Sequence, residues 1–167
     1  LGRVCALSHE SSPATPHVYG MCDSDWEVHR STSGWVFQYM TAAIAWGSKK
    51  QSVIALSSCE AEIMAASETG KEAVHLGNLA EELSETSSEP MEIFVDNKSA
   101  IDLAYNPEHH QRTKHIARRH FYVRDMVEAG ELVVPLVGTA DNSADFLTKP
   151  LKADKFLAFR KVLMNIP

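Results

Sequence analysis

The order of strand-like and helix-like segments limits the fold of this chain more than any other feature. Three β-favouring runs, at residues 18–22, 35–40 and 42–48, precede the first helical pattern. Small residues separate the second run from the third, which is typical of an antiparallel meander. Helical and strand-like segments then alternate to the end of the chain. This order predicts a mixed α/β domain.

The first helix has a recognisable start. Ser57 and Glu60 form an S-x-x-E capping box, in which the serine side chain accepts a hydrogen bond from a first-turn amide and the glutamate reaches back. Apolar residues then recur at three- and four-residue steps up to Leu83. Gly70 and Gly77 weaken this run. A helix that starts at Ser57 is therefore predicted, with a middle that could break it in two.

A strand-to-helix switch follows Pro90. The run at residues 91–95 predicts a short strand that stops at Asp96, and either Asn97 or Ser99 can cap the brief helix after it. Three more elements are predicted: a helix over residues 113–129, a strand over residues 131–137, and a last helical region that Ser143 caps and that resumes over residues 156–164.

Length and composition indicate what class of protein this is. The chain of 167 residues suits one domain, and 44% hydrophobic with 23% charged residues is ordinary for a globular protein. The turn-rich start predicts that residues 1–16 are a linker or the tail of a preceding domain, and that residues 17–167 form the folded domain. Leu1 in place of Met suggests a piece cut from a longer polypeptide. Without a membrane-length apolar run or a secretory signal, we expect an intracellular protein that is not secreted and has no membrane partner.

The charge distribution is uneven. A formal net charge of −6 argues against strong autonomous binding to nucleic acid, because Lys and Arg supply most of the affinity for phosphates. Residues 112–124 are nevertheless strongly basic, whereas residues 81–92 are acidic. A basic run alone is better explained as a solvated helix face. Nucleic-acid binding becomes the better interpretation of this run only if the chain also contains an acidic metal cluster.

Four carboxylates are candidates for such a cluster. Asp23, Glu62, Asp96 and Asp145 each lie at the end of a strand-like run or near a helix start. Carboxylates from distant parts of the sequence can meet at such positions and hold divalent ions. Hard cations such as Mg²⁺ prefer carboxylate oxygens over cysteine or histidine. The set predicts a metal-dependent nuclease.

Each of three candidates has a competitor close in sequence. Asp25 lies two residues from Asp23 and would point to the same side of a strand. Glu60 competes with Glu62 on the helix, although capping explains Glu60 better. Asp141 competes with Asp145, although its turn sequence favours a helix cap. Any of these carboxylates taken alone is more often a solvated surface group than a ligand.

Six strings in order suggest a family: STSGWVF, IAWGSKKQ, ALSSCEAEIMAA, VDNKSAIDLA, RTKHI and SADFLTKPL. They resemble the ribonuclease H domain at the end of the Pol polyprotein of copia-type LTR retrotransposons, over roughly His17 to the C-terminus. The resemblance implies an α/β ribonuclease H-like fold, a five-stranded mixed sheet flanked by helices. It also implies cleavage of the RNA strand of RNA/DNA hybrids during reverse transcription. The implied partners are the hybrid and the reverse transcriptase domain of the same polyprotein, in cytoplasmic virus-like particles or in the nucleus.

The resemblance assigns roles to the four carboxylates. Asp23 would bridge two Mg²⁺ ions, for which Mn²⁺ could substitute. Glu62 and Asp96 would serve the ion near the leaving group, and Asp145 would help to hold the ion that carries the nucleophilic water. We therefore expect these four side chains to converge within a few ångströms around a shared pair of cations.

Other polar residues are predicted to touch the nucleic acid. Ser24, Asn97 and Ser99 lie beside the proposed ligands and could bond to groups in the minor groove, with helix capping as the competing role of Ser99. The remaining predicted contacts go to phosphates of the DNA strand and come from Lys114, Arg118 and Arg119.

Two other functions are weighed against the nuclease. One is a decayed or domesticated remnant that acts as a non-catalytic interaction module, and the less supported one is an integrase or resolvase acting on DNA alone.

Overall fold

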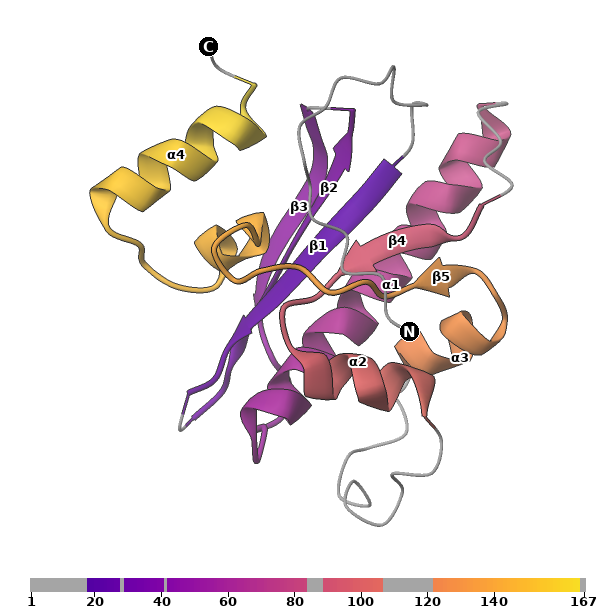
Figure 1. Cartoon of the computed structure of the whole chain (residues 1–167), viewed down its shortest axis with the longest axis horizontal. Coiled ribbons are helices and arrows are strands. Elements are labelled where there is room, and N and C mark those ends of the chain that lie inside the picture. The colour runs from indigo at the N-terminus through magenta and orange to yellow at the C-terminus, as the bar shows by residue number, and fades with distance from the viewer. Residues whose placement is uncertain (1–17, 28, 41, 84–88, 107–121, 166–167) are drawn as a thin grey trace.

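A computed structural model describes residues 18–27, 29–40, 42–83, 89–106 and 122–165. These residues form a five-stranded sheet with helices on both faces (Figure 1). The strands are β1 (Val18–Asp25), β2 (Thr32–Tyr39), β3 (Ala42–Lys50), β4 (Met91–Phe94) and β5 (Leu132–Val133). The helices are α1 (Ser58–Glu82), α2 (Lys98–Tyr105), α3 (Tyr122–Glu128), the 3₁₀ helix η3 (Ser143–Leu147) and α4 (Ala153–Leu163).

The sheet is mixed, with the strand order β3-β2-β1-β4-β5. The first three strands form the predicted antiparallel meander, whereas β4 lies parallel to both β1 and β5. The expected α/β class, with a five-stranded mixed sheet flanked by helices, is therefore confirmed. The first strand continues to Asp25, three residues beyond its predicted end, so Asp23 lies within the strand and not at its end.

Alternating side chains of β1 point to two separate cores. Cys22 packs with Ile63 of α1 and with buried residues of α2 and α3. Met21 instead packs with Val36 and with Ala144 of η3 on the opposite face. Successive residues of a strand face opposite sides of a sheet. The polar residue Asp23 therefore shares the face of Met21, where η3 covers the sheet.

Helix α1 is continuous from Ser58 to Glu82, so the break that Gly70 and Gly77 could have caused does not occur. Ser57 caps it as predicted, with its side chain accepting from the amide of Glu60. Gly70 lies against Leu132 of β5, where an added Cβ would be 3.3 Å from the Leu132 Cδ1 atom. Packing along the sheet thus outweighs the low helix propensity of glycine.

Two predictions on the later elements need correction, and a third is only partly covered by the described residues. Asn142, and not Ser143, caps η3, because its side chain accepts from the amide of Ala144. The strand predicted over residues 131–137 is reduced to two residues and one bridge between Val95 and Leu136. Pro135, which has no N–H to donate, lies between these two pieces. Only the end of the helix predicted over residues 113–129 belongs to the described part of the chain, where it forms α3.

No helix in the described ranges combines the length and the apolar character that crossing a membrane requires.

Candidate metal centre

The parallel register of β1 and β4 places two of the predicted carboxylates at corresponding positions of neighbouring strands. Met21 pairs with Phe94 at the last residue pair of this ladder. Two residues further along each strand are Asp23 and Asp96. The chain turns away into α2 just after Asp96, and Asn97 caps that helix by accepting from the amide of Ala100. The end of the ladder therefore leaves the two carboxylates side by side, with no strand between them.

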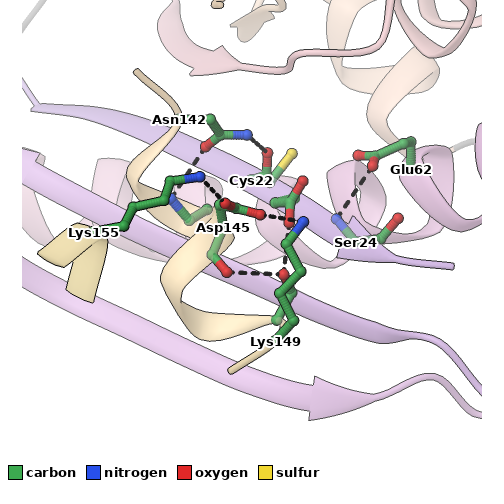
Figure 2. Close-up of polar contacts among 10 residues, drawn as sticks. Cys22, Ser24, Glu62, Asn142, Asp145, Lys149 and Lys155 are labelled. Atoms are coloured by element: carbon green, nitrogen blue, oxygen red, sulfur yellow. Dashed lines mark hydrogen bonds and ion pairs between the residues drawn. The ribbon is translucent and has the colours of Figure 1, made fainter. Parts of the chain in front are cut away.

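Helix α1 supplies the third carboxylate. Glu60 accepts a hydrogen bond from the amide of Leu56 at 2.7 Å, which holds the helix start in place and confirms its predicted capping role. Glu62 follows on the next turn and is turned toward β1, where one of its oxygens accepts from the amide of Ser24 at 3.3 Å (Figure 2). The strand and the helix are thus joined at the site itself.

Asp23, Glu62 and Asp96 each offer an oxygen within 4.8 Å of the other two. Asp23 and Glu62 are almost inaccessible, with 4% and 5% of their surface exposed, and Asp96 is half-buried. Such crowding of like charges in a buried place is costly unless a cation or protons compensate it. The three side chains form a crowded and largely buried carboxylate centre, which we call the acidic triad.

The pKa values express that cost. Burial, followed by the charges of Asp23 and Asp96, raises the pKa of Glu62 from 4.5 to about 8. Burial also raises the pKa of Asp23, and the hydrogen bond from Thr148 opposes this effect. In addition, the second oxygen of Glu62 is buried and accepts no hydrogen bond from the part of the chain that the structure describes. A buried acceptor without a donor, within an all-oxygen ligand set, fits a divalent cation such as Mg²⁺.

Asp145 lies beside the acidic triad but outside the group whose oxygens are within 4.8 Å of one another. Its carboxylate lies between two lysines (Figure 2): Lys149 Nζ is 2.5 Å from one oxygen, and Lys155 of α4 contacts the other. Burial raises the pKa of Asp145, but the hydrogen bonds from both lysines outweigh it, and the net effect is a lowered pKa. The structure therefore brings together three of the four predicted carboxylates, and the role of Asp145 as a fourth ligand stays a prediction.

Helix η3 is fixed to the sheet by polar side chains that the sequence analysis did not single out. The Asn142 side chain donates to the carbonyl oxygen of Cys22 at 2.8 Å. The Thr148 hydroxyl donates to a carboxylate oxygen of Asp23 at 2.6 Å. The one sequence signal for Thr148 was its position three residues after Asp145, within the string SADFLTKPL.

The three competing carboxylates have other positions. Asp25 accepts from the amide of Thr32 across the hairpin. Glu60 caps α1, as described above. Asp141 is exposed, and its predicted capping role is wrong, because the cap of η3 is the neighbouring Asn142. None of the three belongs to the acidic group found among the described residues.

The predicted nucleic-acid contacts fall into two groups. Ser24 is buried beside Glu62, Asn97 caps α2, and Ser99 is exposed on the first turn of that helix and does not cap it. The three basic residues Lys114, Arg118 and Arg119 lie outside the described residues.

Arg124, at the end of the same basic run, is not on a solvated helix face. It is buried, and its guanidinium donates to the carbonyl oxygen of Leu103 at the end of α2. This part of the run therefore serves packing between α2 and α3.

Several known transposon polyproteins have sequences similar to that of this chain. The retrovirus-related Pol polyprotein from transposon TNT 1-94 of Nicotiana tabacum is 40% identical over 145 residues, which cover 84% of this chain and 11% of that protein. That from transposon RE2 of Arabidopsis thaliana is 38% identical over 157 residues, which cover 90% of this chain and 11% of that protein. The chain is a homologue of part of the transposon Pol polyproteins. This confirms the resemblance that the six ordered strings indicated.

The Pol homologue spans about a tenth of the length of these relatives. Among solved structures, ribonuclease H1 from the halophilic archaeon Halobacterium salinarum superposes with a TM-score of 0.57 at 16% sequence identity, covering 84% of this chain and 97% of that one. This likeness shows a ribonuclease H-like fold. No family model matches the chain.

Proposed function

We propose that this Pol homologue is a ribonuclease H that cleaves the RNA strand of RNA/DNA hybrids during reverse transcription of an LTR retrotransposon. The single observation that carries the proposal is the acidic triad, in which oxygens of Asp23, Glu62 and Asp96 lie within 4.8 Å of one another. The ribonuclease H-like fold and the transposon relatives support it.

The ligand set proposed for the metal ions is Asp23, Glu62, Asp96 and Asp145. When bound, two Mg²⁺ ions would stabilise the attacking and leaving oxygens of the phosphodiester and supply an activated water, and Mn²⁺ could substitute. Asp23 lies centrally in this set, because it is near Glu62 and Asp96 on one side and is joined to η3 by Thr148 on the other. Asp145 can take part only if its oxygens exchange Lys149 or Lys155 for a cation.

Residues around the acidic triad are proposed to hold the hybrid. Ser99 is exposed two residues beyond the α2 cap, which suits it to bond to the minor groove. Ser24 and Asn97 are assigned to the same groove, with their contacts close to the ligands. Lys114, Arg118 and Arg119 are assigned to phosphates of the DNA strand, where sequence is not recognised.

The proposed context is a longer polyprotein. In it residues 17–167 would be the ribonuclease H-like domain, and residues 1–16 would be a linker or the tail of a preceding domain, for which a reverse transcriptase is proposed. Virus-like particles in the cytoplasm, or the nucleus, are the proposed locations. A reverse transcriptase could deliver the hybrid, which compensates for the weak phosphate affinity expected at a net charge of −6.

Cleavage assays at low salt test the activity. The purified chain is incubated with matched RNA/DNA, RNA/RNA and DNA/DNA duplexes in Mg²⁺ or in Mn²⁺. We expect cleavage of the RNA strand of the hybrid only, and a fall of about 100-fold or more for Asp96→Asn, which removes one ligand charge. Asp102→Asn on α2, an exposed position outside the acidic triad, is the matched control and keeps wild-type activity. Full activity of Asp96→Asn would reject the assignment of that residue.

A non-catalytic interaction module is the alternative, and the ion pairs of Asp145 favour it, because lysines already neutralise the position proposed for a ligand. A chain that is folded, cleaves none of the duplexes and gains no stability from Mg²⁺ would support this alternative. Cleavage of the DNA/DNA duplex would instead place the chain with nucleases that act on DNA alone.

A further inference from the structure

We propose that Thr148 is a positioning residue for the metal centre: its hydroxyl fixes the carboxylate of Asp23 in the orientation that faces Glu62 and Asp96. The inference rests on the proposed metal site. It concerns a residue that neither binds the cation nor touches the nucleic acid. Its contacts are those of a support that sets the direction of a ligand.

The contact is short, buried and distant in sequence. Thr148 Oγ1 is 2.6 Å from Asp23 Oδ2, and the two residues are 125 positions apart. Only 6% of Thr148 and 4% of Asp23 is exposed, so water hardly competes for this bond. Hydrogen bonds to an ionised acceptor are stronger than neutral ones, and more so in a dry place. This bond therefore restricts rotation of the Asp23 carboxylate.

The single hydroxyl proton of Thr148 has two acceptors within reach. The carbonyl oxygen of Asp145 is 3.0 Å from Oγ1, whereas the Asp23 carboxylate oxygen is closer and charged. The carbonyl of Asp145 also receives the amide of Thr148 itself, at 3.3 Å. Because that carbonyl has another donor and the carboxylate is the stronger acceptor, the hydroxyl proton goes to Asp23.

Gly34 makes room for this arrangement. It pairs directly with Asp23 in the antiparallel ladder of β1 and β2. A Cβ atom at position 34 would lie 2.8 Å from the Thr148 methyl group and 3.0 Å from the carbonyl oxygen of Ala144. The empty space over Gly34 is thus filled by Thr148, with its methyl toward the glycine and its hydroxyl on the neighbouring aspartate. The methyl group thus selects the rotamer of Thr148, and the hydroxyl holds the carboxylate of Asp23.

The matched substitutions Thr148→Val and Thr148→Ser separate these two contributions. Valine keeps the methyl and removes the hydroxyl, whereas serine keeps the hydroxyl and removes the methyl. The affinity for Mn²⁺ is measured by calorimetry on the full chain after chelator treatment, and the Tm of the metal-free protein shows that each variant is folded. We expect Thr148→Val to weaken Mn²⁺ binding about 10- to 100-fold, the range found when a support of a metal ligand is removed. Thr148→Ser should stay within about threefold of wild type, although its Tm falls because a packed methyl is lost.

A second threonine on α1 provides the control. Thr69 is buried, and its hydroxyl donates to the carbonyl oxygen of Ala65 and not to a carboxylate. Thr69→Val therefore makes the same chemical change without touching the acidic triad and should leave the Mn²⁺ affinity unchanged. If Thr148→Val does not fold, Thr148→Ala, which also lacks the hydroxyl, takes its place with the same expected loss.

Wild-type Mn²⁺ affinity in folded Thr148→Val would overturn the inference. A loss in Thr148→Ser as large as that in Thr148→Val would also overturn it, since the role would then be packing alone. The proposed nuclease activity can be rejected independently of this inference. If the wild-type chain binds Mn²⁺ but cleaves no hybrid, the proposed activity is wrong, while the comparison of the two Thr148 variants remains valid. A folded wild-type chain that binds no Mn²⁺ overturns both.

Discussion

Replacing Glu62 by Gln should change how the stability of the metal-free protein depends on pH. Burial, together with the charges of Asp23 and Asp96, raises the pKa of Glu62 from 4.5 to about 8. Each tenfold change in proton affinity corresponds to about 1.36 kcal/mol, so the fully ionised side chain costs the native state about 4–5 kcal/mol. This cost is comparable with the whole stability of a small domain, which is about 5–15 kcal/mol.

The sign follows from the raised pKa. The native state holds the proton of Glu62 more tightly than the unfolded chain does, so between pH 4.5 and about 8 the native state carries more protons. The free energy of unfolding therefore falls as the pH rises through this window, by at most about 1.36 kcal/mol per pH unit from this group. The raised pKa of Asp23 acts in the same direction. The lowered pKa of Asp145 acts below 3.8, outside the window.

Urea unfolding at pH 5 and at pH 8.5, with a chelator present, measures the effect. Glu62→Gln cannot ionise, so we expect it to match wild type at pH 5 and to exceed it by up to about 4 kcal/mol at pH 8.5. Adding Mg²⁺ at pH 8.5 should stabilise wild type but not the variant. Glu60→Gln, two residues earlier on the same helix and outside the acidic triad, should retain the wild-type pH dependence. If wild type shows no loss of stability between the two pH values, or Glu62→Gln shows the same loss, the electrostatic account of the site is wrong.

Two further substitutions test how the space around a glycine decides the effect of an added methyl group. Gly34→Ala should lower the free energy of unfolding by about 1–3 kcal/mol, because its methyl would meet Thr148 and the backbone of η3, and urea unfolding checks this. Gly77→Ala should raise the Tm, by an amount corresponding to about 0.5–1 kcal/mol, because nothing lies within 4 Å of the added methyl on α1. Gly70→Ala is the control and should gain less, since Leu132 is only 3.3 Å away, and an equal rise in Tm for both would contradict the packing argument.

Local signals indicated the positions of the acidic triad, but the choice of Asp23 over Asp25 followed from the resemblance to the ribonuclease H domain and not from the residues alone. Asp96 ends a short apolar run and comes just before a helix cap, and Glu62 follows a capping box by a fixed number of residues. Each of these signals spans only a few residues of sequence. The convergence of the three side chains then follows from the parallel pairing of β1 with β4 and from the packing of α1 on the sheet. The predicted order of segments indicated a mixed α/β domain, but it did not specify these two contacts.

Long-range partners could not be predicted in the same way. Lys155 is ten residues after Asp145 and on a different helix, so no local pattern joins them. The same holds for Arg124, which the charge pattern placed on a solvated face but which donates to the end of α2. The continuity of α1 through Gly70 depends on contact with β5, another long-range feature. Tertiary contacts decide these details, and periodicity or propensity does not reveal them.

The two sides of the centre are in opposite electrostatic states. On one side Glu62 has a raised pKa and retains a proton at neutral pH, so a cation binding there must displace a proton. On the other side Asp145 is ionised with a lowered pKa, and lysines must move before a cation can bind. The first exchange becomes easier as the pH rises. The second hardly depends on pH at Lys149, because the hydrogen bond to Asp145 raises the pKa of that lysine and keeps it charged. The acidic triad is therefore expected to be the pH-dependent part of metal binding. The ion pairs of Asp145 set a separate barrier, which salt weakens at the exposed ends of the lysines.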